Sequence, residues 1–318
     1  MWDRFIGNGI FVFSDPAGAK VCLALNEILK IENIPGSRKL YSNKEYAFYK
    51  QFDSKVEIIE NLNTSNIIGE FDWIFAGTSH PDSSGGFELN MLKNIVAKTS
   101  FSFIDHWTNF ALRFSLKDEI FLPATIFVLD EKAKQLAIDD GLPESKLRLM
   151  ENPYLVYLKC YVQSSTSKTS FCSKLDIPIA KKIILFAPDP ISLRSKDENN
   201  EISVLNELIE ICNTEFTLLL KLHPLQPLDI IGKIINTNPS IKLIKDELFL
   251  PQDVFKNVDC IIGFYSNYLL EASALNKNII RYIFSNNQVD YLSHALSNNS
   301  IVVDNKKDLK FAIKNSCA

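Results

Sequence analysis

An aspartate stands two residues after an apolar run near the start of the chain, in the stretch GIFVFSDPAGAKVCLALNEIL at residues 9–29. Asp15 precedes an apolar-periodic segment, so its carboxylate is placed either to cap a helix or to take a proton from a hydroxyl group. Capping lowers the basicity of a carboxylate, because backbone N–H groups stabilise its charged form. Gly18 and Ala19 let another group approach the turn closely. We therefore keep two hypotheses for Asp15, a helix cap and a general base.

Polar residues also follow the apolar runs at 73–77 and 101–104. The first of these loops is rich in hydroxyl groups and glycines, which suits contact with a sugar or a phosphate. The second combines acid, imidazole and indole groups, and an indole ring can stack on a sugar. Ordinary turn formation and a structural His–Asp pair are the alternatives. We predict acceptor or sugar binding by Gly18, Ser79, His80, Asp105, His106 and Trp107.

In the second half of the chain, the apolar run at 216–222 passes into Lys-Leu-His-Pro. A proline breaks a strand and fixes the direction of the loop that follows. His223, held between Lys221 and Pro224, is therefore a candidate for binding a phosphate. It would donate a hydrogen bond when neutral or stabilise developing charge when protonated. A structural histidine is the competing interpretation, and we favour binding.

Another polar turn follows the apolar run at 260–264. Ser266 and Asn267 stand where a helix is expected to begin, and the free N–H groups and positive dipole end of a helix suit an anion. Glu271 lies about one and a half turns beyond Ser266 and is placed to reach ribose hydroxyls, although it could be an ordinary solvated residue. We predict donor binding by Lys221, Pro224, Ser266, Asn267 and Glu271.

Short apolar runs alternate with helical patterns through most of the chain. Strands that are apolar on both faces and separated by helices are typical of parallel sheets covered on both sides. We expect strands at 10–13, 39–42, 73–77, 101–104, 125–129, 183–187, 216–222, 241–244, 260–264, 278–283 and 301–303. We expect helices at 18–30, 86–98, 131–140, 202–213, 266–276 and 306–315.

The stretch 161–182 is rich in Ser, Thr and Lys and has weak periodicity, which indicates a linker or an excursion. We therefore predict an N-terminal domain at 1–165 and a C-terminal domain at 166–318. The fold class is α/β, with two doubly wound Rossmann-like domains facing a central cleft. Ligands in such sheets bind beyond the carboxyl ends of the strands, so the polar turns described above are where chemistry is expected.

The composition describes an ordinary globular chain of 318 residues, of which 46% are hydrophobic and 23% charged, with a net charge of −4. This balance argues against a broad basic surface for nucleic acid. Six cysteines without paired spacing predict neither a disulfide framework nor a zinc site. The first apolar run is too short and interrupted for a signal peptide, and no run reaches the ~18 residues of a membrane span. We expect a cytoplasmic protein.

The polar turns of the second half belong to a longer pattern. KLHP followed by DCIIGFYSNYLLEASALNKNIIRY resembles the C-terminal domain of GT-B glycosyltransferases. The resemblance is to bacterial enzymes that build capsule, lipopolysaccharide or teichoic acid chains, including sialyl- and Kdo-type transferases and glycerophosphotransferases. SDPAGA and DHWTNFALRF are similar to matching segments of polysaccharide glycosyltransferases of this group. The resemblance implies a GT-B architecture and a nucleotide-sugar donor.

The resemblance also implies roles for individual residues. His223 would assist departure of the nucleotide phosphate, Ser266 and its neighbouring amides would bind that phosphate, and Glu271 would hold the ribose. Asp15 would be the base that deprotonates the acceptor. The doubled serine of some relatives is Ser266 followed by Asn267 here.

We therefore expect an inverting, metal-independent glycosyltransferase that transfers a sugar to a surface polysaccharide or another glycan, free or lipid-linked. No two aspartates are separated by a single residue, so the DxD metal motif of GT-A enzymes is absent, and no cofactor is expected. The resemblance favours a CMP-linked nonulosonic acid as donor, with UDP- and CDP-linked sugars as alternatives. The stretch at 306–314 could form a helix that touches the inner face of the membrane, but we favour a helix packed across the two domains.

Two other functions stay open. A non-hydrolysing sugar-nucleotide epimerase shares the two-domain architecture and would form its product from the donor alone. A catalytically silent nucleotide-sugar-binding module would keep its binding and its biological output when Asp15 is replaced by alanine.

Overall fold

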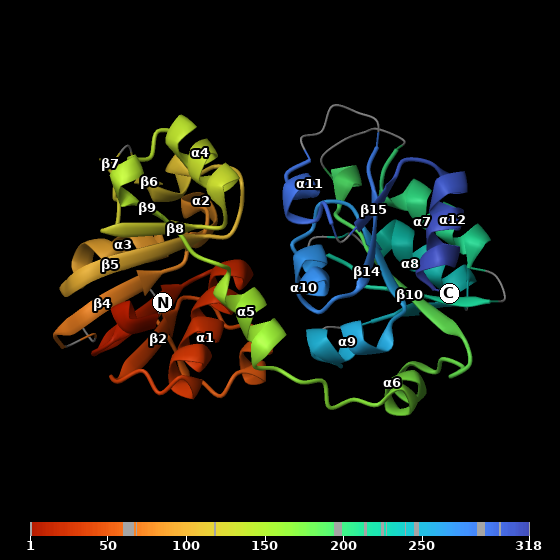
Figure 1. Cartoon of the computed structure of the whole chain (residues 1–318), viewed down its shortest axis with the longest axis horizontal. Helices are drawn as coiled ribbons and strands as arrows, with labels where there is room; N and C mark the ends of the chain where they lie inside the picture. Colours follow the sequence, from red (N-terminus) through yellow and green to blue (C-terminus); the bar gives the residue numbers. More distant parts are fainter. Residues whose placement is uncertain are drawn as a thin grey trace. The chain divides into compact units, whose positions relative to one another are not determined.

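The computed structural model divides into two compact units, Met1–Tyr161 and Val162–Ala318 (Figure 1). The expected domains were 1–165 and 166–318. Each unit has its own sheet and its own core, and each is described by itself. The structure describes residues 2–59, 67, 69–117, 119–193, 199–212, 215–223, 226, 228–238, 240–244, 248–284, 290–298 and 300–317.

The first unit is built on a sheet whose described strands follow the order β3-β2-β1-β4-β5-β8-β9. Every pairing in this sheet is parallel. The chain moves outward from β1 in one direction and then adds β4 on the other side of β1. The space beyond the carboxyl ends of β1 and β4 is therefore the topological switch point, where ligands bind in doubly wound folds. The strands are β1 (Gly9–Phe13), β2 (Arg38–Ser42), β3 (Val56–Ile58), β4 (Phe71–Ala76), β5 (Ala97–Ile104), β8 (Thr125–Val128) and β9 (Leu147–Leu149).

Apolar side chains of β1 alternate between two buried faces. Phe11 packs edge-on against Trp73, with 5.1 Å between ring centroids, whereas Ile10 and Val12 share a buried cluster with Phe87 of α3. Burial on both faces is the reason why β1 is a continuous apolar run. The helices are α1 (Pro16–Ile31), α2 (Pro81–Ser84), α3 (Phe87–Asn94), α4 (Glu131–Asp139) and α5 (Pro153–Cys160). A short antiparallel pair is formed by β6 (Ser115–Leu116) and β7 (Glu119–Ile120), and 3-10 helices lie at Trp2–Phe5, Ala47–Gln51, Ala111–Phe114 and Glu144–Lys146.

The second unit repeats this topology in its described residues, with the strand order β12-β11-β10-β13-β14-β15. All of its pairings are parallel. The switch point of this unit lies between β10 and β13. The strands are β10 (Lys182–Ala187), β11 (Phe216–Leu220), β12 (Ile241–Leu243), β13 (Cys260–Gly263), β14 (Asn278–Tyr282) and β15 (Ser300–Val303).

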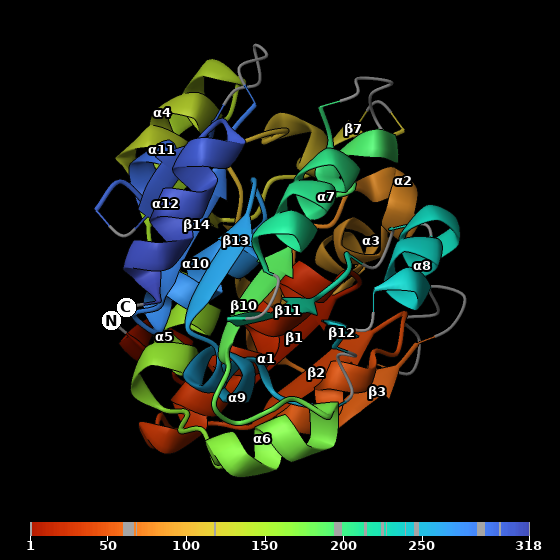
Figure 2. The same ribbon diagram turned by 90° about the vertical axis from the view of Figure 1, so that its right-hand side faces the viewer.

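Helices cover both faces of the second sheet, with α9 and α10 on one face and α7, α8 and α12 on the other (Figure 2). Leu208 of α7, Ile231 of α8 and Ile313 of α12 join the strands in one buried cluster. The C-terminal helix α12 thus packs on the sheet of its own unit. The helices are α6 (Lys168–Leu175), α7 (Glu201–Ile211), α8 (Leu228–Thr237), α9 (Pro251–Asn257), α10 (Tyr268–Ala274), α11 (Leu292–Ala295) and α12 (Lys306–Ser316), and a 3-10 helix lies at Ile191–Leu193.

The start of the stretch 161–182 is hydrogen-bonded to α9. Asp253, in the first turn of α9, accepts a hydrogen bond from the hydroxyl of Ser164 at 2.8 Å. It also accepts bonds from the backbone N–H groups of Ser165 and Thr166, at 3.1 and 3.0 Å. Buried carboxylates need such donors, because an unpaired buried charge is costly. Helix α6 follows two residues later.

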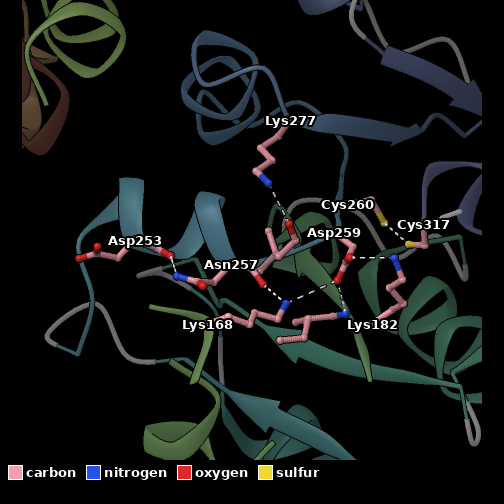
Figure 3. A network of polar contacts seen from close by, with 10 residues as sticks. Lys168, Lys182, Asp253, Asn257, Asp259, Cys260, Lys277 and Cys317 are labelled. Carbon is pink, nitrogen blue, oxygen red and sulfur yellow. Dashed lines mark hydrogen bonds and ion pairs between the residues drawn. The ribbon is translucent and has the colours of Figure 1, made fainter. Parts of the chain in front are cut away.

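A second carboxylate ties α6 and the start of β10 to β13 (Figure 3). Asp259, one residue before β13, accepts a hydrogen bond from the N–H of Ile183 at 2.7 Å. Its carboxylate lies 3.7 Å from Nζ of Lys168 and 3.5 Å from Nζ of Lys182. Polar contacts thus hold both ends of the segment from Ser164 to Ile183 against the rest of the second unit.

The expected α/β fold of two doubly wound sheets is confirmed, and each predicted strand corresponds to an observed one. The predicted helix 86–98 is too long, because Ile95 takes up an extended conformation (φ −92°, ψ 127°) after α3 and β5 begins at Ala97. The pattern missed the short strands β3, β6, β7 and β9 and the helices α2, α5, α6, α8, α9 and α11. In the part of the chain that the structure describes, no helix has the length and apolar character needed to traverse a bilayer.

Candidate functional site

Asp15 lies at the carboxyl end of β1, at the switch point of the first unit. It is the N-cap of α1: its backbone is extended, and its Oδ1 accepts a hydrogen bond from the N–H of Gly18 at 2.7 Å. Pro16 occupies the first helical position, where a backbone N–H would have no acceptor within the helix, so the missing N–H of proline costs no hydrogen bond. The cap engages one carboxylate oxygen, so capping by Asp15 does not exclude proton transfer.

Burial raises the pKa of Asp15 to about 7, and the nearby carboxylates of Asp105 and Glu88 act in the same direction. The N–H of Gly18 and the guanidinium of Arg113 oppose the rise. Desolvation and like charges therefore outweigh the effect of the cap. A carboxyl group with this pKa is partly ionised at neutral pH, which suits a group that must both accept and release a proton.

Glu88, in the first turn of α3, is buried and binds the residue before Asp15. Its Oε1 accepts a hydrogen bond from the N–H of Ser14 at 3.0 Å, and its Oε2 accepts one from Oγ of Ser79 at 2.7 Å. Oγ of Ser14 lies 3.2 Å from the same Oε2. Burial raises the pKa of Glu88, and these donors oppose the rise. One carboxylate thus joins the ends of β1 and β4.

The segment after β5 adds Asp105, His106 and Arg113 to this cluster. Arg113 donates a hydrogen bond to the main-chain oxygen of Thr78, which follows β4. Burial lowers the pKa of His106 and Arg113 adds to this, while Asp105 opposes it. The imidazole is therefore neutral at pH 7, and its buried Nδ1 has no hydrogen-bond partner among the described residues. Asp105, which follows β5, thus lies near enough to affect the pKa of both Asp15 and His106.

Gly18 and Gly77 allow the turns after β1 and β4 to meet. A Cβ atom at Gly18 would lie 3.2 Å from Cα of Gly77, and a Cβ atom at Gly77 would lie 3.3 Å from Cα of Gly18. The close approach predicted at Gly18 is therefore made by the protein's own backbone, which corrects the prediction that a sugar approaches there.

Three predicted sugar-binding residues have structural contacts instead. Trp107 is 3% exposed, and its Nε1 donates to the carboxylate of Asp130, the N-cap of α4. It presents no ring face to a sugar, which corrects the prediction of stacking. Nδ1 of His80 accepts the N–H two residues further on and caps α2. The hydroxyl of Ser79 is buried against Glu88, as described above.

In the second unit, the loop after β11 carries Lys221 and His223. Nζ of Lys221 lies 5.0 Å from the ring centroid of Tyr268, at the start of α10. The main-chain oxygen of His223 accepts a hydrogen bond from the N–H of Gln226 at 2.9 Å. Pro224, predicted to bind the donor, lies outside the described residues. The loop after β11 and the turn before α10 therefore come together at Lys221 and Tyr268.

Helix α10 begins at Tyr268, two residues later than expected. Oγ of Ser266 accepts the N–H of Tyr268 at 3.2 Å, and the main-chain oxygen of Ser266 accepts the N–H of Leu269 at 3.0 Å. Two of the N–H groups predicted to be free for a phosphate are thus already engaged, although Ser266 and Asn267 remain at the turn. Glu271 is 5% exposed, so it is not an ordinary solvated residue.

A sequence-family model covers the part of the chain that contains these second-unit residues. The chain matches the family model of the alpha-2,8-polysialyltransferases over residues 114–283, which is more than half of its length. The matched region contains His223 and the turn at Ser266 and Asn267. The chain belongs to the alpha-2,8-polysialyltransferase family. No curated protein sequence matches it.

Several solved structures share the fold of this polysialyltransferase family member. An S. aureus MnaA–UDP co-structure is 14% identical, with a TM-score of 0.69 over 97% of this chain and 87% of its own. The Methanocaldococcus jannaschii UDP-GlcNAc 2-epimerase with UDP-GlcNAc and UDP is 14% identical, with a TM-score of 0.67 over 98% and 93%. The wall teichoic acid polymerase TagF is 11% identical, with a TM-score of 0.62 over 97% and 81%. At these identities the similarity shows the fold, a GT-B architecture of two Rossmann-like domains.

Family and fold together identify the polysialyltransferase family member as an enzyme of the glycosyltransferase type. The expected resemblance to glycosyltransferases of bacterial surface glycans is confirmed at this level. Within the described ranges, no cluster of three or more His, Cys, Asp or Glu side chains has the arrangement of a metal site.

Sequence reasoning missed two residues that shape the sites of this polysialyltransferase family member, Glu88 and Glu201. Glu201, at the start of α7, accepts hydrogen bonds from the N–H of Ser192 at 2.9 Å and from Nε2 of Gln226 at 2.8 Å. Both glutamates are in first helical turns, where acidic residues are common for local reasons. The sequence carried no signal that these two are buried.

Proposed function

We propose that this protein transfers a nonulosonic acid from a CMP-linked donor to a hydroxyl group of a glycan acceptor, without a metal and with inversion at the anomeric carbon. The observation that carries the proposal is Asp15, a carboxyl group with a pKa of about 7 at the switch point of the first unit. Such a group can remove a proton from an alcohol during the transfer and return it to solvent afterwards.

The proposed reaction is a single displacement. The carboxylate of Asp15 takes the acceptor's hydroxyl proton while the hydroxyl oxygen forms a bond to the anomeric carbon. The bond between that carbon and the donor's phosphate oxygen breaks, and CMP leaves with the electron pair. We assign stabilisation of the departing phosphate to His223, Lys221 and the turn at Ser266 and Asn267. Because the acceptor attacks from the face opposite the leaving group, the configuration inverts.

The donor class follows from the family, whose name describes transfer of sialic acid. UDP-linked sugars are the second choice, because two similar structures contain UDP, and CDP-linked sugars are the third. The acceptor we propose is a glycan, free or lipid-linked. Cytoplasmic localisation is part of the proposal and is supported by the cysteines, which are free thiols as a reducing compartment would keep them.

Calorimetric titration with CMP, CDP, UDP and GDP, without added metal, tests the donor assignment. We expect CMP to bind most tightly and the binding to weaken in His223→Ala and Ser266→Ala. Equal binding in these variants would remove the second unit from the donor role. No binding of any nucleotide would contradict the transferase.

A sugar-nucleotide 2-epimerase is the second candidate, because epimerases with this fold match nearly the whole chain. In that case Asp15, Asp105 and His106 would move protons on the donor sugar itself. Incubation of UDP-GlcNAc with the enzyme and no acceptor distinguishes the two. A C2-epimerised product detected by NMR would favour the epimerase, whereas transfer that requires both donor and acceptor favours the proposal.

A further inference from the structure

Glu88 has no part in the proposed transfer, yet it is 4% exposed and lies among the groups around Asp15. A buried carboxylate is costly unless its charge is compensated, so its retention at this place calls for an explanation. Its hydrogen bonds go to Ser14 and Ser79, which follow β1 and β4.

We propose that Glu88 is a positioning residue for Asp15: its carboxylate holds Ser14, the residue before Asp15, in place and sets a second carboxyl group beside that of Asp15. The inference rests on the proposed function for its catalytic meaning. Its physical content, the effect of one carboxylate on another, can be measured in the protein without any substrate.

The positioning part follows from the contacts of Ser14. Its N–H and its hydroxyl group both face Glu88, at 3.0 and 3.2 Å. Its main-chain oxygen accepts a hydrogen bond from the hydroxyl of Tyr46 at 2.9 Å. Every polar group of Ser14 is therefore held, which fixes the backbone from which Asp15 begins. Gly77 leaves the room for Glu88, since a Cβ atom there would lie 3.5 Å from Oε1.

The electrostatic part follows from the charges around Asp15. Asp105 and Glu88 disfavour its ionised form, and Arg113 favours it. Burial raises the pKa of Cys22 and of Tyr46, so these two groups are uncharged at neutral pH. His106, whose pKa is lowered by burial, is also neutral there. In its ionised form Glu88 therefore acts together with Asp105 to favour the protonated form of Asp15.

Substitution of Glu88 by glutamine separates charge from shape. The carbonyl oxygen of Glu88→Gln can still accept the N–H of Ser14, and its amide can donate to the oxygen of Ser79, so the fold should persist. We expect the pKa of Asp15 to fall by about one unit when the like charge is removed. The ¹³C signal of the Asp15 side-chain carboxyl, assigned by its loss in Asp15→Asn, reports this pKa in a pH titration.

Glu27→Gln is the matched control. Glu27 is also a buried glutamate of the first unit that binds a serine hydroxyl, but it lies about 18 Å further along α1. Its replacement should leave the titration of Asp15 unchanged. Glu88→Asp tests the opposite change. It keeps the negative charge but has a shorter side chain, which should lose its hydrogen bonds to Ser14. In Glu88→Asp the pKa of Asp15 should stay raised while kcat falls.

An Asp15 titration that is the same in folded Glu88→Gln and in the wild type would overturn the proposal. If Glu88→Gln does not fold, Ser79→Ala replaces it. Loss of this donor makes Glu88 harder to ionise, so the pKa of Asp15 should fall in the same direction by a smaller amount. An unchanged or higher pKa would contradict the inference.

Kinetics separate this inference from the proposed function. In Glu88→Gln the acid limb of the kcat/KM profile should move to lower pH by the shift that NMR measures. If Asp15→Asn keeps full transfer activity, the proposed function is wrong, and the NMR titration still decides the role of Glu88. If Asp15→Asn is inactive but the limb does not move, Glu88 has no electrostatic role.

Discussion

The two units share one topology but place different side chains beyond the carboxyl ends of their strands. At the ends of β1 and β4 the first unit collects Asp15, Glu88 and Asp105. The loop after β11 in the second unit carries Lys221 and His223 instead. In the proposed mechanism, residues beyond the strands of the first unit move a proton, and residues beyond the strands of the second unit bind a phosphate.

Both units contain the same glutamate–serine contact near the end of their first strand. In each unit a buried glutamate from the first turn of a helix binds the N–H and the hydroxyl of a serine that follows the first strand. In the first unit this pair is Glu88 and Ser14, and in the second it is Glu201 and Ser192. Only in the first unit is the serine followed by an aspartate, Asp15; in the second unit Ser192 is followed by Leu193. The glutamate–serine contact is therefore common to both units, whereas the proposed acid–base group next to it is present in the first unit alone.

The largest effect is expected from removing the acid–base group of the first unit. Asp15→Asn keeps a good helix cap but cannot accept a proton, so kcat for transfer should fall about 1,000-fold. CMP affinity, which we assign to the second unit, should not change. Transfer rates in a coupled CMP-release assay and calorimetry with CMP check both halves. A fall in CMP affinity as large as the fall in kcat would contradict the assignment of CMP binding to the second unit alone.

The next effect is expected from the imidazole of the second unit. His223→Ala should lower kcat about 100-fold, because the departing phosphate loses a donor. The pH at which kcat/KM reaches half its plateau on the acid side should stay that of Asp15. Gln226→Ala serves as a control for the loop conformation, since the side chain of Gln226 ties the loop to Glu201. Equal losses in both variants would mean that His223 acts through loop structure.

The raised pKa of Asp15 also predicts how stability depends on pH. Between the ordinary aspartate pKa of 3.8 and about 7, the folded protein holds a proton that the unfolded chain has released, so stability falls as the pH rises. Asp15→Asn removes this penalty. Relative to wild type, the variant should gain about 2 kcal/mol between about pH 5 and pH 8. Thermal unfolding of both proteins across this range measures it, and a pH-independent difference would contradict the raised pKa.

A smaller effect is expected at the start of α10. Ser266→Ala removes a hydroxyl that accepts the N–H of Tyr268 and that we assign to the donor phosphate. Loss of one such hydrogen bond corresponds to about 1 kcal/mol, or about fivefold weaker CMP binding. Ser273→Ala, later in the same helix, is the control for helix stability. Unchanged CMP affinity in Ser266→Ala would leave the hydroxyl with its capping role alone.

Much of the fold could be read from the sequence, because buried parallel strands are continuous apolar runs between helical patterns. The strands β1, β10 and β13 were visible for this reason. The edge strands β3 and β9 were not, since they are three residues long and mostly exposed. The helices α6 and α9 were missed because they are only eight and seven residues long, too short for a clear helical period.

Residue types at the strand ends, such as Asp15, Asp105 and His223, were determined by the sequence alone, since the carboxyl end of an apolar run is a place that spacing predicts. Their environment was decided by the tertiary structure. Trp107 became a buried partner of Asp130, and Glu88 became a neighbour of Asp15 from 73 positions away. Burial and like charge depend on residues that only folding brings together, so the pKa that gives Asp15 its proposed role is a property of the folded chain.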